Sequence, residues 1–345
     1  MKELIKLSQI KRFQSISSVI YECDRTDQPW VCVLPGRSEI MRIVKHEMGG
    51  NGYFPLNVCG KIIDFRFMKE LHSELCQRAY FHPHLAALYH DKEITIQSIH
   101  NYFLGFFGNS LEFNWRFRHM PIYTEKHFYL PFIPKLENVT FCVDFWISGD
   151  RVRTGTTEFT EMRRLEAFFS SSPVLKSIRM HARETTEPFN PESKFYQTES
   201  IDINQSRHTF PALLRHFQGR HAFIQCFTCE TLDLIAFVNR WKSGEAFQKL
   251  EYLQIKQLGA EFPQNQILDA IGAKHMNAET QPPTHTVPKI YSWRHSNNPN
   301  TDPIISQTYV VRETDSRVAS VQIQDKIFSF GTWDKTEEEF LRMVD

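Results

Sequence analysis

The stretch Leu250-Glu251-Tyr252-Leu253-Gln254-Ile255 alternates apolar and polar side chains, the pattern of a strand buried on one face. The segment Leu175 to Met180 resembles it, with Leu-x-Ser-Ile-x-Met set against Leu-x-Tyr-Leu-x-Ile. Helical apolar spacing precedes each stretch, at 158–170 and at 231–242. We therefore expect units in which a helix leads into a strand.

Further units of this kind surround these two. Helical patterns at 97–107 and 209–217 precede strand patterns that begin at Leu111 and at Ala222. Such units, each roughly 25 to 45 residues long, are typical of a leucine-rich-repeat-like solenoid, whose parallel strands form one continuous surface. The sequence thus predicts an α/β protein with an irregular leucine-rich-repeat-like body over 95–276.

The alternation also predicts a binding face. Leu253 and Ile255 are the natural core pair of their strand, so Tyr252 and Gln254 should face outward. The repeat register should place Arg179 beside them. We expect Arg179, Tyr252 and Gln254 to bind the partner of this protein.

The N-terminal flank has two parts. Residues 1–20 read as a helix with leucine and isoleucine on one side. Residues 30–94 form a small β-containing region, because short β-type runs between 30 and 68 are separated by glycine-containing turns.

Two polar stretches interrupt the rest. Residues 183–199 are rich in Glu and Thr and should form an exposed loop. Residues 277–303 contain five prolines and should be a linker or loop. In 304–345, three β-runs joined by polar turns predict an antiparallel meander, followed by a short acidic helix from Lys335 onward.

The composition disfavours several classes of partner. Lys and Arg total 40, and Asp and Glu also total 40, so the 345-residue chain lacks the basic surplus of a nucleic-acid binder. No apolar run approaches the roughly 20 residues that cross a bilayer, and no signal peptide is visible. The seven scattered cysteines favour reduced thiols. We expect a cytoplasmic or nuclear protein with neither a nucleic-acid nor a membrane partner.

Catalytic and metal motifs are weak in this sequence. Cys226-Phe227-Thr228-Cys229 has the spacing of a redox or zinc motif, but Cys226 lies on a strand pattern, where a small buried hydrophobe is ordinary. His82-Pro83-His84, with His72 and His90 nearby, is better explained as a solvated loop. Trp115 and Trp146 are possible interface anchors, although core is the better reading. We expect no catalytic residue, cofactor or metal, and predict a protein that is not an enzyme.

Several segments resemble one known family. Glu3-Leu4-Ile5-Lys6-Leu7-Ser8-Gln9-Ile10-Lys11-Arg12 resembles the second half of the F-box of the large nematode F-box families. Downstream, three segments are similar to the type 2 F-box-associated domain: Leu234 to Lys242, Lys249 to Ile255, and Val311 to Val321. The resemblance spans nearly the whole chain.

The resemblance implies a function. F-box proteins bind a Skp-type adaptor that links them to a cullin scaffold and a ubiquitin ligase, and the associated domain recruits the substrate. It implies that the adaptor is bound by an apolar stripe of this chain, which consists of Leu4, Ile5, Leu7 and Ile10. With this role for the associated domain, the partner that the strand register places at Arg179, Tyr252 and Gln254 is expected to be a protein substrate, whose identity the sequence does not reveal.

Two departures from the family bear on this expectation. The chain begins after the proline- and leucine-rich first helix of the F-box, so we expect weak adaptor binding that an upstream helix would restore. The family's closing hairpin turn commonly carries Asp-Gly, where this chain has Asp315-Ser316, which suggests another turn type or mild strain.

Three alternatives stay open. The chain could be a truncated or divergent family member that binds proteins without engaging the ligase. The gene model could lack its first exon. The alternative of another class is a redox or zinc enzyme that uses Cys226 and Cys229.

Overall fold

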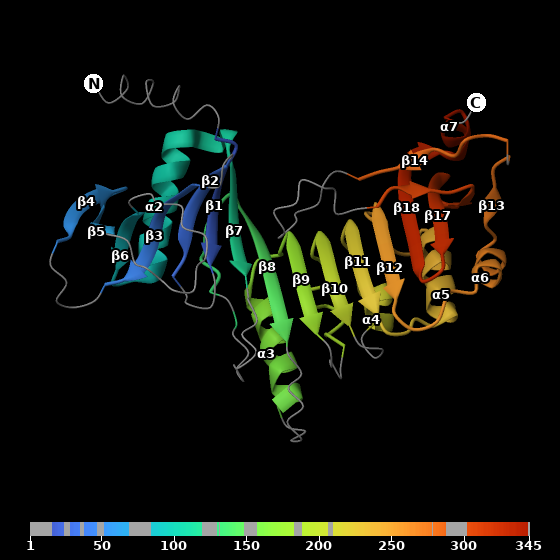
Figure 1. Cartoon of the computed structure of the whole chain (residues 1–345), viewed down its shortest axis with the longest axis horizontal. Coiled ribbons are helices and arrows are strands. Elements are labelled where there is room, and N and C mark those ends of the chain that lie inside the picture. Colours follow the sequence, from blue (N-terminus) through green and yellow to red (C-terminus); the bar gives the residue numbers. More distant parts are fainter. Residues whose placement is uncertain are drawn as a thin grey trace. The chain divides into compact units, whose positions relative to one another are not determined.

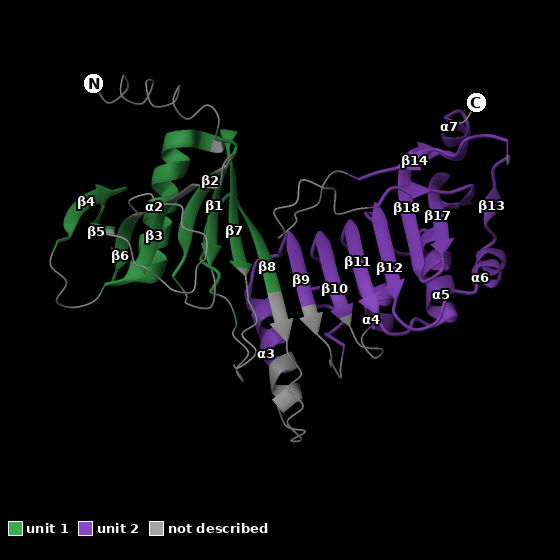
Figure 2. Cartoon of the chain, viewed as in Figure 1, with its two compact units in different colours: residues 1–122, 129–144 green, residues 123–128, 145–345 purple. Residues whose placement is uncertain are grey.

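The structure, a computed structural model, forms two compact units (Figures 1 and 2). Unit 1 comprises residues 1–122 and 129–144, and unit 2 comprises residues 123–128 and 145–345. The structure describes residues 16–23, 28–34, 38–46, 52–68, 84–118, 130, 132–147, 157–182, 188–205, 210–277, 279–287 and 302–343. The division near residue 144 falls inside the stretch 95–276 that we expected to be one body.

Unit 1 is a sheet with one long helix. Its strands are β1 (Ser18–Cys23), β2 (Trp30–Leu34), β3 (Ser38–Lys45), β4 (Phe54–Val58), β5 (Lys61–Met68), β6 (His84–Tyr89), β7 (Glu112–Arg118) and the first part of β8 (Val139–Ile147). Their order is β8-β7-β1-β2-β3-β6-β5-β4. The β8–β7, β7–β1 and β3–β6 pairs are parallel, and the others are antiparallel. The expected small N-terminal β-region is therefore present.

The expected helix over 1–20 is wrong at its C-terminal end. Residues 1–15 lie outside the described residues, but Ser18, Val19 and Ile20 belong to strand β1, of which every residue is buried. β-branched and aromatic side chains favour strands, and β1 pairs on both sides, with β2 and β7. The residues from Ser18 onward therefore join a sheet and do not continue the helical sequence pattern that precedes them.

Helix α2 (Lys92–Phe107) has clear start and stop signals. The side chain of Asp91 accepts a hydrogen bond from the backbone N–H of Ile94 at 3.0 Å, which satisfies a free donor of the first turn. At the other end, Gly108 has a φ of 64° and donates its N–H to the carbonyl of Leu104. The predicted helix and its glycine cap are confirmed, and η1 (Gly108–Ser110) leads on to β7.

Unit 2 is the helix–strand body with the terminal meander. Its strands are β9 (Ser177–Ala182), β10 (Ser200–Gln205), β11 (His221–Cys226), β12 (Tyr252–Gln257), β13 (Lys274–His275), β14 (Thr284–His285), β15 (Ile304–Ile305), β16 (Thr308–Val311), β17 (Arg317–Gln324) and β18 (Ile327–Thr336). Its helices are α3 (Thr157–Ser171), α4 (Phe210–His216), α5 (Thr231–Lys242), α6 (Gln264–Ala270) and α7 (Glu337–Leu341). The strand order is β9-β10-β11-β12-β18-β17-β16-β13, with β14 and β15 as a separate pair.

The repeating body is confirmed in this unit. Strands β9 to β12 are parallel, and α3, α4 and α5 precede β9, β11 and β12 (Figure 1). Strand β10 was not predicted, and no helix immediately precedes it. Residues 188–199 stand there instead, and they bury Phe189, Phe195 and Tyr196. The expectation of an exposed loop is therefore wrong for 188–199, because its aromatic residues are part of the core.

One face of the unit 2 sheet packs on the helices. Helix α5 buries residues at positions i, i+3, i+4 and i+7: Leu234, Phe237, Val238 and Trp241. The rings of Phe237 and Trp241 each lie 5.2 Å from the ring of Phe330 in β18. Phe330 is the register partner of Leu253, so the predicted core side of β12 faces α5.

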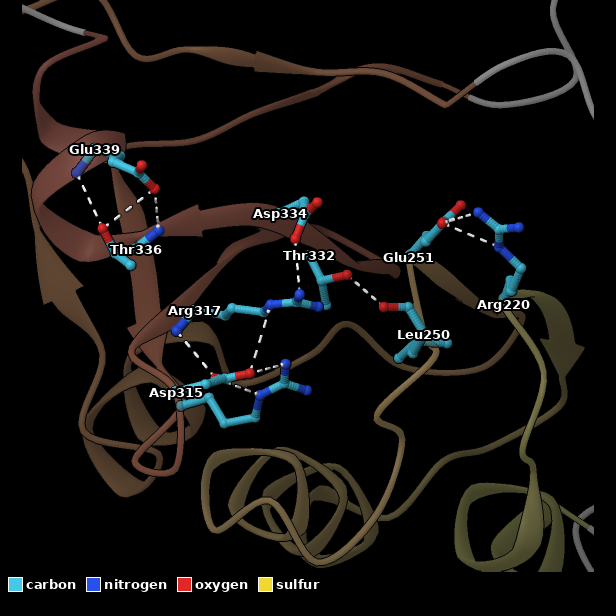
Figure 3. Close-up of polar contacts among 10 residues, drawn as sticks. Arg220, Leu250, Glu251, Asp315, Arg317, Thr332, Asp334, Thr336 and Glu339 are labelled. Carbon is cyan, nitrogen blue, oxygen red and sulfur yellow. Dashed lines mark hydrogen bonds and ion pairs between the residues drawn. The ribbon is translucent and has the colours of Figure 1, made fainter.

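The C-terminal meander is also confirmed, since β16, β17 and β18 pair antiparallel in succession. At its turn, Ser316 has a φ of 57°, a conformation that glycine adopts at lower cost. The side chain of Asp315 accepts hydrogen bonds from Arg312 and from the backbone N–H of Arg317 (Figure 3). Thr336 and Glu339 then form a capping box that starts α7 (Figure 3).

The chain is thus an α/β protein with leucine-rich-repeat-like helix–strand units, a small N-terminal β-region and a C-terminal antiparallel meander. None of the described helices has the length and apolar character needed to span a membrane.

Candidate protein-binding surface

The face of β9–β12 opposite to the helices carries polar side chains in rows. Parallel pairing aligns Arg179, Asp202, Phe223 and Gln254 across the four strands. The next row toward the C-terminal ends of the strands continues with further amides and a lysine. We call these residues the open face: Arg179, Asp202, Asn204, Phe223, Gln225, Gln254 and Lys256.

Hydrogen-bonding groups of both kinds lie close together on the open face. The Nε of Arg179 lies 3.3 Å from an Oδ of Asp202, and the Asp202 side chain is 55% exposed. On β12, the amide of Gln254 donates to the carboxylate of Asp302 at 3.2 Å. Guanidinium, carboxylate and carboxamide groups can all bond to peptide groups and polar side chains, so this surface is chemically suited to a protein ligand.

The structure confirms the strand register and corrects one residue of the predicted binding face. Leu253 and Ile255 are buried on the helix side, and Arg179 and Gln254 share one row of the open face. Tyr252 points to the same side as Gln254 but is 0% exposed. Tyr252 is therefore not available to a partner.

Tyr252 is buried because residues from 284–287 and from 302–304 lie over this end of the sheet. Its hydroxyl donates to the backbone carbonyl of Asp302 at 2.9 Å, and its ring stacks with His285 at 6.4 Å between centroids. Gly331 on β18 lies in register with Tyr252, and a Cβ added there would come within 2.6 Å of the His285 ring. We call His285, Asp302 and Ile304 the cover.

His285 and Asp302 of the cover lie in the stretch 277–303, which we expected to be a linker or loop. Strands β14 and β15 pair antiparallel, and His285 and Ile304 are buried, so the described ends of this stretch belong to the folded unit. Residues 288–301 lie outside the described residues. The prolines of this stretch carry no information on what the flanking residues cover.

A charged cluster lies at the N-terminal end of β12. Arg220 donates to Glu251 (Figure 3). The ring of His221 lies 3.0 Å from the other carboxylate oxygen. Burial raises the pKa of Glu251, but hydrogen bonds and the charge of Arg220 outweigh burial and leave it below its usual range. Burial lowers the pKa of His221 despite Glu251. His221 therefore favours its neutral form in the fold.

The cysteine pair does not have the environment of a redox centre. Cys226 is fully buried on β11 and Cys229 nearly so. A hydrogen bond with Cys226 is the main reason, with burial second, that the pKa of Cys229 is raised. A reactive cysteine needs the opposite shift, toward the thiolate. Among the described residues, neither cysteine belongs to a group able to hold a metal.

The other sequence expectations divide between described and undescribed residues. Leu4, Ile5, Leu7 and Ile10 lie outside the described residues. So do His72, His82 and the side chain of Trp146, whereas Trp115 is fully buried in unit 1 and cannot anchor a partner. Asp202 and Phe223 were missed, because β10 was not predicted and the β11 pattern was not assigned a face.

Comparison of the chain with protein-family models, with curated proteins and with solved structures found no match.

Proposed function

We propose that this chain is a protein-recognition module and acts as the substrate-binding component of a Skp–cullin–F-box ubiquitin ligase. The observation that carries the proposal is the open face: a row of mixed donors and acceptors on a sheet whose other side is a rigid core. The F-box-like segment at residues 3–12 supports the assignment to a ligase.

The open face supports protein recognition for a physical reason. Arg179 is held by Asp202, and Gln254 is held by Asp302, so both donors are partly ordered before a partner arrives. Ordered side chains lose less conformational entropy on binding. Phe223 adds a half-exposed aromatic ring between them, 5.4 Å from Tyr252. Arginine and aromatic residues dominate binding energy in interfaces.

The substrate arm is tested with the full chain. We expect Arg179→Glu with Gln254→Ala to weaken substrate capture roughly 30-fold, the factor that corresponds to a loss of about 2 kcal/mol at a binding hot spot. The measurement is affinity purification from cells with quantitative mass spectrometry. Arg163→Glu, the same charge reversal on an exposed position of α3, is the matched control and should capture the wild-type set.

Stability must be compared in the same preparations. Because Arg179 and Asp202 form a partly exposed ion pair, the double variant should lose only about 0–1 kcal/mol of folding free energy. If a folded double variant captures the wild-type set of proteins, the open face is not the binding surface.

Binding to the adaptor is tested in a separate experiment. We expect calorimetric titration of the chain with a purified Skp-type adaptor to give weak binding that Leu4→Asp with Leu7→Asp abolishes, while substrate capture persists. Adding an upstream F-box helix should strengthen this binding. Absence of adaptor binding even then would refute the ligase role and favour a protein-binding family member outside the ligase.

A further inference from the structure

The sheet of unit 1 brings two histidines and an aspartate together at one edge. Strands β3 and β6 are parallel, with Lys45 in register with Tyr89, so His46 and His90 follow at the same level of the sheet. The backbone N–H of His46 donates to the carbonyl of Tyr89 at 2.8 Å, which holds the two chain ends in this register. Asp64 enters from β5, opposite Leu88 of β6.

The side chains converge. The Nε2 of His46 lies 3.3 Å from an Oδ of Asp64, and the His46 and His90 rings stack with centroids 4.3 Å apart. One ligand atom from each of the three residues lies within 4.8 Å of the others. In the part of the chain that the structure describes, no other group of three His, Cys, Asp or Glu residues satisfies this condition.

We propose that His46, Asp64 and His90 bind a divalent transition-metal ion, with zinc as the physiological candidate. Zinc takes imidazole nitrogen and carboxylate oxygen at about 2.0–2.2 Å in a tetrahedron, whose ligands are then about 3.3–3.5 Å apart. The separation of His46 from Asp64 already matches that spacing. The exposed His90 ring now stacks on His46, and it has to turn out of this stack to direct a nitrogen at the same ion. Two imidazoles and one carboxylate leave the fourth position for water or another ligand.

A simple ion pair accounts for the cluster less well. A pair of His46 and Asp64 alone would leave the His90 ring, which stacks on His46, without a part in the cluster. Neutral imidazoles are the form that binds metal. The carboxylate then supplies the negative charge that the cation requires.

The surroundings also suit a metal site. The His46 side chain is 11% exposed and the Asp64 side chain 23%, whereas His90 is exposed, so the site is open to solvent on one side. Tyr53 packs edge-on against the His46 ring at 5.3 Å and limits its rotation. The site departs from our expectation of a chain without metal, because His46 and Asp64 show no motif spacing to His90 in the sequence.

Zinc titration of the full chain tests the site. The protein is purified without a histidine tag, dialysed against a chelator and titrated with Zn²⁺ in competition with a chromogenic chelator. We expect one equivalent to bind tightly, and His46→Ala or His90→Asn to weaken that binding more than about 100-fold, since even outer-shell partners contribute 10–100-fold. Co²⁺ bound to the same site should show the visible absorption of a tetrahedral complex.

The control variants make the test decisive. His275→Asn removes an exposed histidine elsewhere, and Cys226→Ser with Cys229→Ser removes both paired thiols, so both should keep the zinc equivalent. His90 is exposed, so His90→Asn without metal should melt at the wild-type temperature. Zinc binding that survives His46→Ala and His90→Asn, or that disappears with the two cysteines, would overturn the proposal, as would the absence of a saturable site.

Discussion

The two faces of the unit 2 sheet are built on different principles. The helix side is apolar: Leu253 and Ile255 of β12 face α5, the helix that precedes this strand in the sequence, and Phe330 of β18 packs on the same helix. The opposite side is polar and only partly closed, by the cover of His285, Asp302 and Ile304. Local pattern therefore defines the first face, whereas the second depends on where a distant segment lies.

The largest expected effect lies on the helix side. Phe330→Ala should reduce the free energy of unfolding by about 3–5 kcal/mol, because its ring fills the space between Phe237 and Trp241. Phe227→Ala, the same change at a ring that is 59% exposed, should shift it by no more than about 0.5 kcal/mol. Urea unfolding measures both. Equal losses would mean that the helix-side core does not dominate stability.

A smaller effect is expected on the covered side. Gly331→Ala places a Cβ within 2.6 Å of the His285 ring and 2.9 Å of Ile304, so overpacking should cost about 1–3 kcal/mol. In a double-mutant cycle, His285→Ala should remove most of this cost, since the clash is lost with the ring. Gly105→Ala in α2, where nothing lies within 4 Å, should be neutral or stabilising. If the losses of unfolding free energy caused by Gly331→Ala and His285→Ala simply add in the double variant, residue 331 does not contact the His285 ring as described.

The smallest expected effect is the pH dependence of stability, to which His285 on the covered side contributes. Burial lowers the pKa of His285 below its ordinary value of 6.5, although its contact with the Thr332 carbonyl and the charge of Glu251 oppose this. A lowered histidine pKa means that the folded state binds fewer protons than the unfolded state. The contribution of neutral His285 to the free energy of unfolding is therefore complete above pH 6.5, and it is lost as the pH falls through and below that value.

We therefore expect the free energy of unfolding to decline from pH 7.5 to 5, and the decline to be shallower in His285→Gln. Urea unfolding at several pH values measures the slope. His275→Gln, an exposed histidine on β13, should leave the slope unchanged. A slope unaffected by His285→Gln would show that His285 is not held neutral by the cover.

Much of the fold could be predicted from local pattern. Helix α5 was predicted at its observed bounds and β12 within two residues, and the three strands of the terminal meander were predicted in their observed order, because apolar spacing reports backbone geometry directly. Strand β1 was misassigned because its burial does not alternate: all six residues are buried, Ser18 and Glu22 included. A strand buried on both faces need not show a regular alternation of apolar and polar side chains.

The candidate sites divide in the same way. The sequence by itself determined that Leu253 and Ile255 face the core and that Arg179 and Gln254 face away, since side chains alternate along any strand. Only the tertiary structure decided that Tyr252 is covered by a segment 50 residues away, and that His46, Asp64 and His90 meet. Alternation is a property of a few adjacent residues, whereas burial and convergence depend on strand pairing and chain return between segments that carry no local sign of each other.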